Sequence, residues 1–289
     1  MTRRRADAVL IGACAIWGLS FPAVKVALAD ASPLAFVALR FLIAAVLLVP
    51  GTPLRPRPGP GELRAGLLLG VLLATGFAAQ AVGLTNTTPS RSAFIVAMSS
   101  VLAPVVAWAV VRERLAWWTV AALGIAAAGM YLLTDPGGGG LNRGDLWTLL
   151  TAAVFGGQIV AVRELGLRYD VRRLVLMQVA FTAVAVGIAA PFLEPVRMAW
   201  TPRLLGALAY TGVAATAGAL LLQMYAQRHM TSARAALLFC SEPLFASLAS
   251  WLWLGERLAA LQWVGGALIV GGMVLADLPA RAPSLEAKS

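Results

Sequence analysis

Apolar segments about as long as a membrane-crossing helix make up most of this chain. Of its 289 residues, 60% are hydrophobic and 12% are charged, whereas a soluble domain carries roughly 25% charged residues. A membrane-crossing helix needs roughly 20 mostly apolar residues. The sequence predicts an all-α polytopic membrane protein whose ten helices lie at about 7–29, 33–50, 63–84, 89–110, 116–133, 145–163, 172–192, 203–224, 232–253 and 258–276.

The two halves of the chain repeat each other at a nearly fixed spacing. The tripeptide at 113–115 recurs at 256–258, 143 positions later, and Arg91 matches Arg234 at the same spacing. Five segments per half is an odd number, so the second half must enter the bilayer from the opposite side. We therefore predict two inverted five-helix repeats, an organisation typical of secondary transporters with one site near the bilayer midplane. Further matches are Gln80 with Gln223 at the same spacing, and Asp7, Gly18 and Lys25 with Asp145, Gly156 and Arg163 at a spacing of 138.

A run of four glycines ending at Gly140 separates the halves and is typical of a flexible joint. We divide the chain into a first repeat at 1–135, a linker at 136–143, a second repeat at 144–279 and a tail at 280–289. Lysines and arginines concentrate in the loops on the side that holds the N-terminus, which the positive-inside rule places in the cytoplasm. With ten spans both termini are cytoplasmic, and we expect a multi-pass protein of the inner (plasma) membrane.

The composition excludes several other classes of protein. The formal net charge of +10 resides in short loops between apolar segments, so it indicates membrane topology, not a nucleic-acid partner. Two cysteines and one histidine do not have the spacing of a zinc site. We expect no cofactor and no metal.

Glu242 is a carboxylate near the centre of the ninth apolar segment, directly before Pro243. A charge at the bilayer centre costs at least ~2.5–3.5 kcal/mol, so its side chain must face a cavity, pair with a base or be protonated. One interpretation is a site for a substrate amine or for proton coupling. The other is a structural carboxylate held by hydrogen bonds, by Arg40 or by Lys25.

Aromatic and polar side chains lie at similar depths in other segments. Trp17, Ser20 and Phe21 share one helical face, and an amide that faced lipid would be costly. Such a lining suits a mid-sized amphipathic metabolite, although ordinary packing also explains single aromatic residues. The predicted substrate-binding residues are Trp17, Ser20, Phe21, Phe77, Gln80, Phe94, Met98, Ser99, Phe155, Gln158, Gln223 and Glu242.

Arg40 lies several residues into the second segment and matches Gln178 in the second half. Its side chain could extend outward to the membrane surface, serve a structural role or bind a substrate carboxylate, and we favour the structural role.

Three motifs resemble those of the EamA family of the drug/metabolite transporter superfamily. They are the stretch at 15–22 (Ala-Ile-Trp-Gly-Leu-Ser-Phe-Pro), the tripeptide at 39–41 (Leu-Arg-Phe) and the stretch at 241–258, which contains Ser-Glu-Pro and Gly-Glu-Arg-Leu. The resemblance covers nearly the whole chain in two copies. It implies ten helices in two inverted halves and the export of small metabolites. The branch that the chain most resembles exports amino acids, including aromatic ones. The first copy departs from this pattern, with Ser99-Ser100 where the second has Glu242-Pro243.

The leading hypothesis is a transporter, not an enzyme, that works by alternating access in the lipid bilayer on a small molecule such as an amino acid. Because the pathway lies between the halves of one chain, a monomer is sufficient. An intramembrane serine protease with Ser20 as nucleophile and His229 as base is an alternative, although the two residues are expected at different depths and a base must reach its nucleophile. A non-transporting membrane scaffold is a third hypothesis.

Overall fold

A computed structural model of the chain describes residues 3–55, 57–111, 117–133, 140–230 and 241–277, together with residues 235, 238 and 239. Within these ranges the chain forms helices and one isolated β-bridge, between Ala31 and Met198. The all-α prediction is confirmed for this part of the chain. The first half of the predicted linker (136–139), the tail at 280–289 and most of the beginning of the ninth predicted segment lie outside the described residues.

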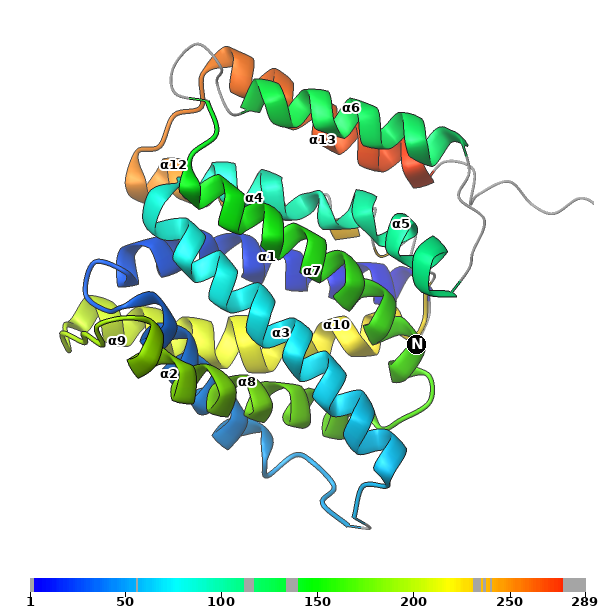
Figure 1. Cartoon of the computed structure of the whole chain (residues 1–289), viewed down its shortest axis with the longest axis vertical. Helices are drawn as coiled ribbons and strands as arrows, with labels where there is room; N and C mark the ends of the chain where they lie inside the picture. The colour runs from blue at the N-terminus through cyan, green and yellow to red at the C-terminus, as the bar shows by residue number, and fades with distance from the viewer. Residues whose placement is uncertain are drawn as a thin grey trace, which may run out of the picture.

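The helical elements follow one another with short connections (Figure 1). Several begin with proline in the first turn, where its missing N–H is not needed. They are α1 (Arg3–Ala27), α2 (Pro33–Leu48), α3 (Pro60–Asn86), α4 (Pro89–Ala97), α5 (Ser99–Val111), α6 (Trp117–Leu133), α7 (Arg143–Gly166), α8 (Val171–Leu193), α9 (Pro202–Ala209), the π-helix η1 (Tyr210–Gly218), α10 (Ala219–Gln227), α12 (Glu242–Leu254) and α13 (Ala260–Asp277).

The outer surface of the helices is apolar, as expected for a protein in lipid. Large apolar side chains such as Phe192 (83% exposed), Trp117 (76%) and Val110 (73%) lie on it, far more apolar surface than a soluble monomer exposes. In the described part of the chain, six helical segments are long and apolar enough to cross a membrane: Arg4–Ala27, Pro60–Asn86, Pro89–Val110, Arg143–Gly166, Val171–Leu193 and Pro202–Gln227. The chain is therefore a multi-pass membrane protein. The other predicted spans correspond to shorter helices.

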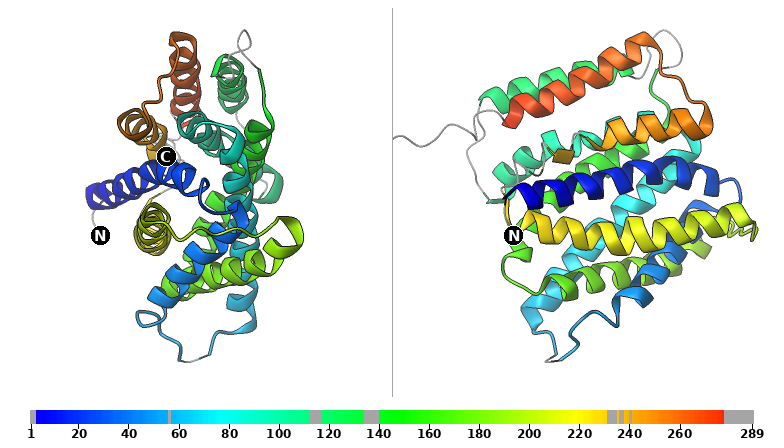
Figure 2. Two further views of the ribbon diagram at one scale, coloured as in Figure 1. Left: turned by 90° about the vertical axis from the view of Figure 1, so that its left-hand side faces the viewer. Right: turned by 180° about the vertical axis from the view of Figure 1, so that it is seen from behind.

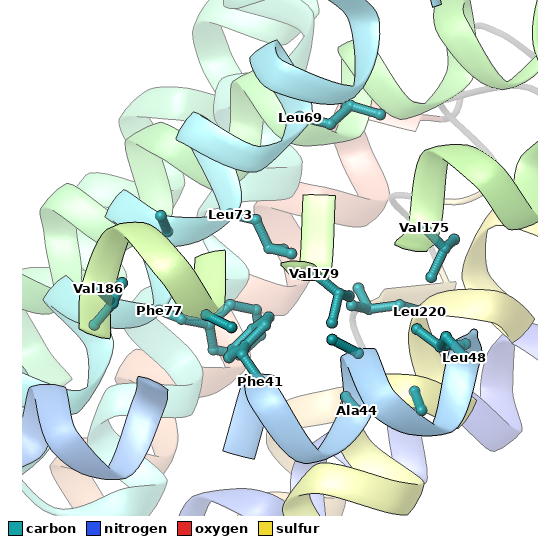
Figure 3. Packing of buried hydrophobic residues seen from close by; sticks show 14 of the residues in the cluster. Phe41, Ala44, Leu48, Leu69, Leu73, Phe77, Val175, Val179, Val186 and Leu220 are labelled. Carbon is teal, nitrogen blue, oxygen red and sulfur yellow. The ribbon is translucent and has the colours of Figure 1, made fainter. Parts of the chain in front are cut away.

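The helices pack in pairs from the two halves of the chain. The helices α6 and α13 lie side by side at one end of the long axis, and α2 and α8 lie together near the other (Figures 1 and 2). Between them, α1 contacts α12 and α10, whereas α7 contacts α5 and α3. The largest apolar core joins α2, α3, α8 and α10, and Figure 3 shows Phe41, Leu73, Phe77 and Leu220 within it.

Two predicted helices are not regular along their length. The segment predicted at 89–110 is divided at Met98 into α4 and α5, and the segment predicted at 203–224 contains the π-helix η1. In η1 the hydroxyl of Thr216 donates to the carbonyl of Thr211, five residues earlier, at 2.7 Å. Hydroxyls that bond backbone carbonyls, and widened turns of this kind, alter regular helices and often occur at functional sites.

A buried ion pair joins α4 to the beginning of α7. The carboxylate of Asp145 is inaccessible to solvent and accepts a hydrogen bond from the guanidinium of Arg91. Asp145 also accepts from the hydroxyl of Thr87 at 2.8 Å and from the backbone N–H of Asn142 at 2.9 Å. Because this carboxylate is shielded from solvent, its charge is stabilised by these donors alone among the described residues.

We predict that Arg91→Ala lowers the free energy of unfolding by about 3–5 kcal/mol, because it leaves the buried charge of Asp145 without its cation. The measurement is the apparent melting temperature of the purified protein in detergent, which should fall clearly below that of the wild type.

Arg203→Ala is the matched control. Arg203 donates to Asp30 at 2.8 Å but is 54% exposed, and exposed ion pairs contribute little. The hydrogen bonds from Arg203 and Thr201 lower the pKa of Asp30 to about 2, so the control pair is intact at neutral pH and is lost only as pH falls through that value. Equal melting temperatures for the two variants would contradict the prediction.

Candidate functional site: a cavity between the helices

A cavity with about 660 Å³ of empty space, its open mouth included, lies among helices of both halves. Its wall combines aromatic, aliphatic, amide, hydroxyl and carboxylate side chains. They are Trp17, Ser20, Phe21, Leu73, Phe77, Gln80, Val96, Ala97, Ser99, Phe155, Gln158, Ile159, Leu220, Gln223, Phe239 and Glu242.

Of the predicted binding residues, all except Phe94 and Met98 lie on this wall. Phe94 is buried instead against α13, where a Cβ atom added to Gly266 would lie 2.7 Å from its ring. Met98 packs against the same apolar cluster. The helix α4 turns Val96 toward the cavity, and two residues along a helix point about 200° apart. Phe94 therefore lies on the face of α4 that points away from the cavity, whereas the sequence analysis predicted it among the binding residues.

Six lining residues were missed by the sequence analysis: Leu73, Val96, Ala97, Ile159, Leu220 and Phe239. The repeat offers a signal for some of them. Leu220 stands 143 positions after Phe77, and Phe239 stands the same distance after Val96. Applied to the predicted residue Phe77, the repeat spacing would have placed Leu220 on the wall, whereas Phe239 matches Val96, which was itself not predicted.

Trp17 presents its ring to the cavity while its N–H is bound elsewhere. The indole N–H donates to the carbonyl of Ala215, in η1, at 2.7 Å. The ring lies 6.1 Å from that of Phe239, centroid to centroid. One turn along α1, the hydroxyl of Ser20 donates to the carbonyl of Trp17 at 2.7 Å. These two bonds leave an aromatic face and a hydroxyl oxygen for a ligand.

Gly18 brings α1 against the first turn of α12. A Cβ atom at this position would lie 2.6 Å from the Cβ of Phe245 and 2.8 Å from the carbonyl oxygen of Glu242. Real side chains do not approach so closely, so any larger residue would push the two helices apart. The absent side chain of Gly18 therefore sets how near Trp17 and Glu242 lie.

Glu242 is the first residue of α12 and lines the cavity. The positive end of the helix dipole favours a carboxylate at this position. Within the described part of the chain no hydrogen bond or ion pair reaches this carboxylate. Lys25 donates to the carbonyls of Leu84 and Thr87, so the structure gives no support to a structural pair between Lys25 and Glu242.

Arg40 is 2% exposed and does not line the cavity. Its Nε and Nη2 atoms donate to the hydroxyl of Thr216, and its guanidinium lies 4.8 Å from the centre of the Phe77 ring. The ring face and the hydroxyl stabilise the cation inside the protein. This is the structural role that the sequence analysis favoured, and an outward-extended side chain is excluded.

The three amides on the wall differ in their partners. The Nε2 atom of Gln158 donates to Oε1 of Gln178 at 2.9 Å, and the Oε1 atom of Gln158 is buried without a partner. The side chains of Gln80 and Gln223 have no hydrogen-bond partner among the described residues. The wall therefore offers unused hydrogen-bonding groups to a ligand.

The geometry offers no support for the protease hypothesis. Ser20 lies on the cavity wall, but its hydroxyl already donates to Trp17. His229 follows the end of α10, is exposed, and lies with its Nδ1 atom 2.8 Å from the carbonyl oxygen of Tyr225. His229 does not line the cavity, so it is not positioned to activate Ser20.

Relatives of this chain are transporters by name. A protein of Archaeoglobus fulgidus named an uncharacterized transporter is 30% identical over 276 residues, covering 96% of this chain and 87% of the relative. A probable terminal-alkyne amino-acid exporter of Streptantibioticus cattleyicolor is 28% identical over 278 residues, covering 90% of this chain and 89% of the relative.

The fold also matches a known structure. A protein crystal structure aligns over 97% of this chain and 99% of its own length, with a TM-score of 0.71 at 20% sequence identity. The sequence model of the EamA-like transporter family matches residues 4–135 and again residues 142–276. Because the two matches together span nearly the whole chain, the protein belongs to the EamA-like transporter family.

Proposed function

We propose that this protein is a secondary transporter that exports small amphipathic metabolites, above all amino acids including aromatic ones, by alternating access through the central cavity. The observation that carries the proposal is that both halves of the chain contribute equivalent positions to the same wall. Every lining residue except Leu73 and Ala97 has a lining partner at the repeat spacing. The pairs are Trp17 with Phe155, Ser20 with Gln158, Phe21 with Ile159, Phe77 with Leu220, Gln80 with Gln223, Val96 with Phe239 and Ser99 with Glu242.

Helix contacts repeat with the same spacing and support an inverted duplication. A Cβ atom at Gly18 would meet the Cβ of Phe245, the carbonyl oxygen of Glu242 and the nitrogen of Ala246. At Gly156, the repeat match of Gly18, it would meet the equivalent atoms of Leu102, Ser99 and Ala103, which stand 143 positions before those three residues.

The helices α6 and α13 show the same relation. A Cβ atom at Gly129 would lie 2.6 Å from the carbonyl oxygen of Gly265, and one at Gly272 would lie 2.8 Å from that of Ala122. Gly272 is the repeat match of Gly129, and Gly265 is the repeat match of Ala122, so the two contacts are copies of each other with the halves exchanged. Such reciprocity is what a two-fold axis through the cavity produces, and it supports ten spans in two inverted halves.

In this topology both termini face the cytoplasm of a cell whose inner membrane holds the protein, because the basic loops flank that side. A polar cluster then lies at the outer end. Lys25 donates to carbonyls at the end of α3, Ser90 donates to Glu256 at 2.9 Å, and Arg91 pairs with Asp145. The Ser90–Glu256 and Arg91–Asp145 bonds join the two halves, so outward opening requires that these two bonds break.

The wall suits an amphipathic solute. Rings of Phe77 and Phe155, 5.3 Å apart, provide apolar contact, while amides and Glu242 provide polar contact. One relative carries the name of an amino-acid exporter, which favours amino acids among amphipathic solutes. Glu242 is also the residue that we propose for proton coupling.

Counterflow of labelled phenylalanine into proteoliposomes tests the proposal. We predict saturable exchange by the wild type and loss of most exchange in Ser99→Trp, because the larger side chain fills the cavity. Val110→Trp is the matched control, since Val110 is 73% exposed on the same helix, α5, and it should retain wild-type exchange. Size-exclusion chromatography checks that both variants are folded.

Wild-type vesicles that exchange no labelled amino acid, or equal exchange by the two tryptophan variants, would contradict the proposal.

The same vesicles test proton coupling. An imposed pH gradient should drive net phenylalanine flux in the wild type and not in Glu242→Gln, and a flux that ignores the gradient would exclude proton coupling at Glu242.

A further inference from the structure

The described residues of the cavity wall include an acidic side chain but no basic one. Among the described residues that line it, Glu242 is the one that ionises, and no lysine or arginine reaches the wall. Arg40 does not line the cavity; its guanidinium lies 4.8 Å from the centre of the Phe77 ring, with Thr216 as its hydrogen-bond partner. A ligand that enters the cavity therefore meets a carboxylate and no opposing cation.

The hydrogen bonds within the wall also favour a cationic ligand, because they use donors and leave acceptors free. The N–H of Trp17 is used by Ala215, and the hydroxyl hydrogen of Ser20 is used by the carbonyl of Trp17. What these groups leave free is a ring face and an oxygen lone pair. Gln158 is 5% exposed, and its Oε1 atom lacks a partner while its Nε2 atom is bound to Gln178. A buried acceptor without a donor is costly, so a ligand with N–H groups would be favoured there.

Aromatic faces complete the arrangement. Trp17 and Phe239 lie together at 6.1 Å, and Phe77 and Phe155 lie together at 5.3 Å. The negative face of an aromatic ring attracts a cation, and this attraction strengthens away from water. Among the described residues, the side-chain donors without a partner that this wall offers a substrate carboxylate are all neutral: the amides of Gln80 and Gln223 and the hydroxyl of Ser99. Neutral amides compensate the lost hydration of an anion poorly.

We propose that the cavity recognises the ammonium group of its substrate, with Glu242 as counter-charge, and does not require the substrate's carboxylate. Primary amines with an aromatic or aliphatic tail are then ligands in their own right, and amino acids are bound through their amine. The inference rests on the proposed function for its cavity, and it adds the class of substrate.

Three probes with the same phenyl tail separate the contributions of the two charged groups. They are phenylalanine, 2-phenylethylamine, which lacks the carboxylate, and 3-phenylpropionate, which lacks the amine. Calorimetric titration of the full-length protein in detergent gives their affinities, and counterflow in proteoliposomes gives their transport. We expect 2-phenylethylamine to bind at least as tightly as phenylalanine, and 3-phenylpropionate to bind at least about tenfold more weakly, the scale of one unpaired charge.

Glu242→Gln removes the charge at nearly constant volume and should weaken binding of 2-phenylethylamine by at least about tenfold. Glu242→Asp keeps the charge and should retain part of the affinity. Glu164→Gln is the control, because Glu164 pairs with Arg163 outside the cavity. Should Glu242→Gln fail to fold, the affinities of wild-type protein for 2-phenylethylamine and 3-phenylpropionate still test the ammonium site.

The outcomes separate the inference from the proposed function. Phenylalanine exchange with equal affinities for amine and acid, or with unchanged amine affinity in Glu242→Gln, would overturn the ammonium site and leave the transporter. Amine binding that depends on Glu242, without exchange of any probe, would support the site and overturn transport. Absence of binding by all three probes would overturn the ammonium site.

Discussion

A polar side chain in the apolar part of a membrane protein must be paired inside the protein or face a cavity, and the rest of this structure depends on that constraint. Arg40 satisfies it with Thr216 and the ring of Phe77, and Gln178 satisfies it with Gln158. Glu242 has no such partner in the described part of the chain and lines the cavity instead. The cavity therefore allows this carboxylate to lie inside the protein without a partner.

Helices can enclose such a space only where their backbones come close at other points. Gly18 gives α1 its contact with α12, and Gly129 gives α6 its contact with α13. In a membrane the hydrophobic effect does not drive helices together, so small residues and close packing determine where they meet. The same contacts hold Glu242 beside α1 and Trp17 beside η1. The motifs at 15–22 and 241–258 thus contribute both to helix packing and to the cavity wall.

Much of the fold and most of the wall were predictable, because hydropathy and helical spacing report which face of a helix is apolar. Trp17, Ser20 and Phe21 follow from spacing alone. Phe94 was misplaced because an aromatic residue beside polar ones suits both a cavity and a helix contact, and only the packing against Gly266 decides. The division at Met98 and the π-helix η1 could not be predicted, since they depend on hydrogen bonds between side chains and backbone. Span number is a prediction that helix length does not test, because several helices are shorter than a bilayer is thick.

The central claim is that the two halves are inverted copies around one cavity, and labelling of matched positions tests it most directly. Thr85 and Arg228 are exposed, stand at the ends of α3 and α10, and are repeat partners. Single cysteines at these positions, in a chain whose Cys14 and Cys240 are replaced by alanine, can be treated with a membrane-impermeant maleimide in intact cells. The account predicts labelling of the cysteine at position 85 from outside, and labelling at position 228 only after the membrane is opened. Labelling of both positions from the same side would contradict it.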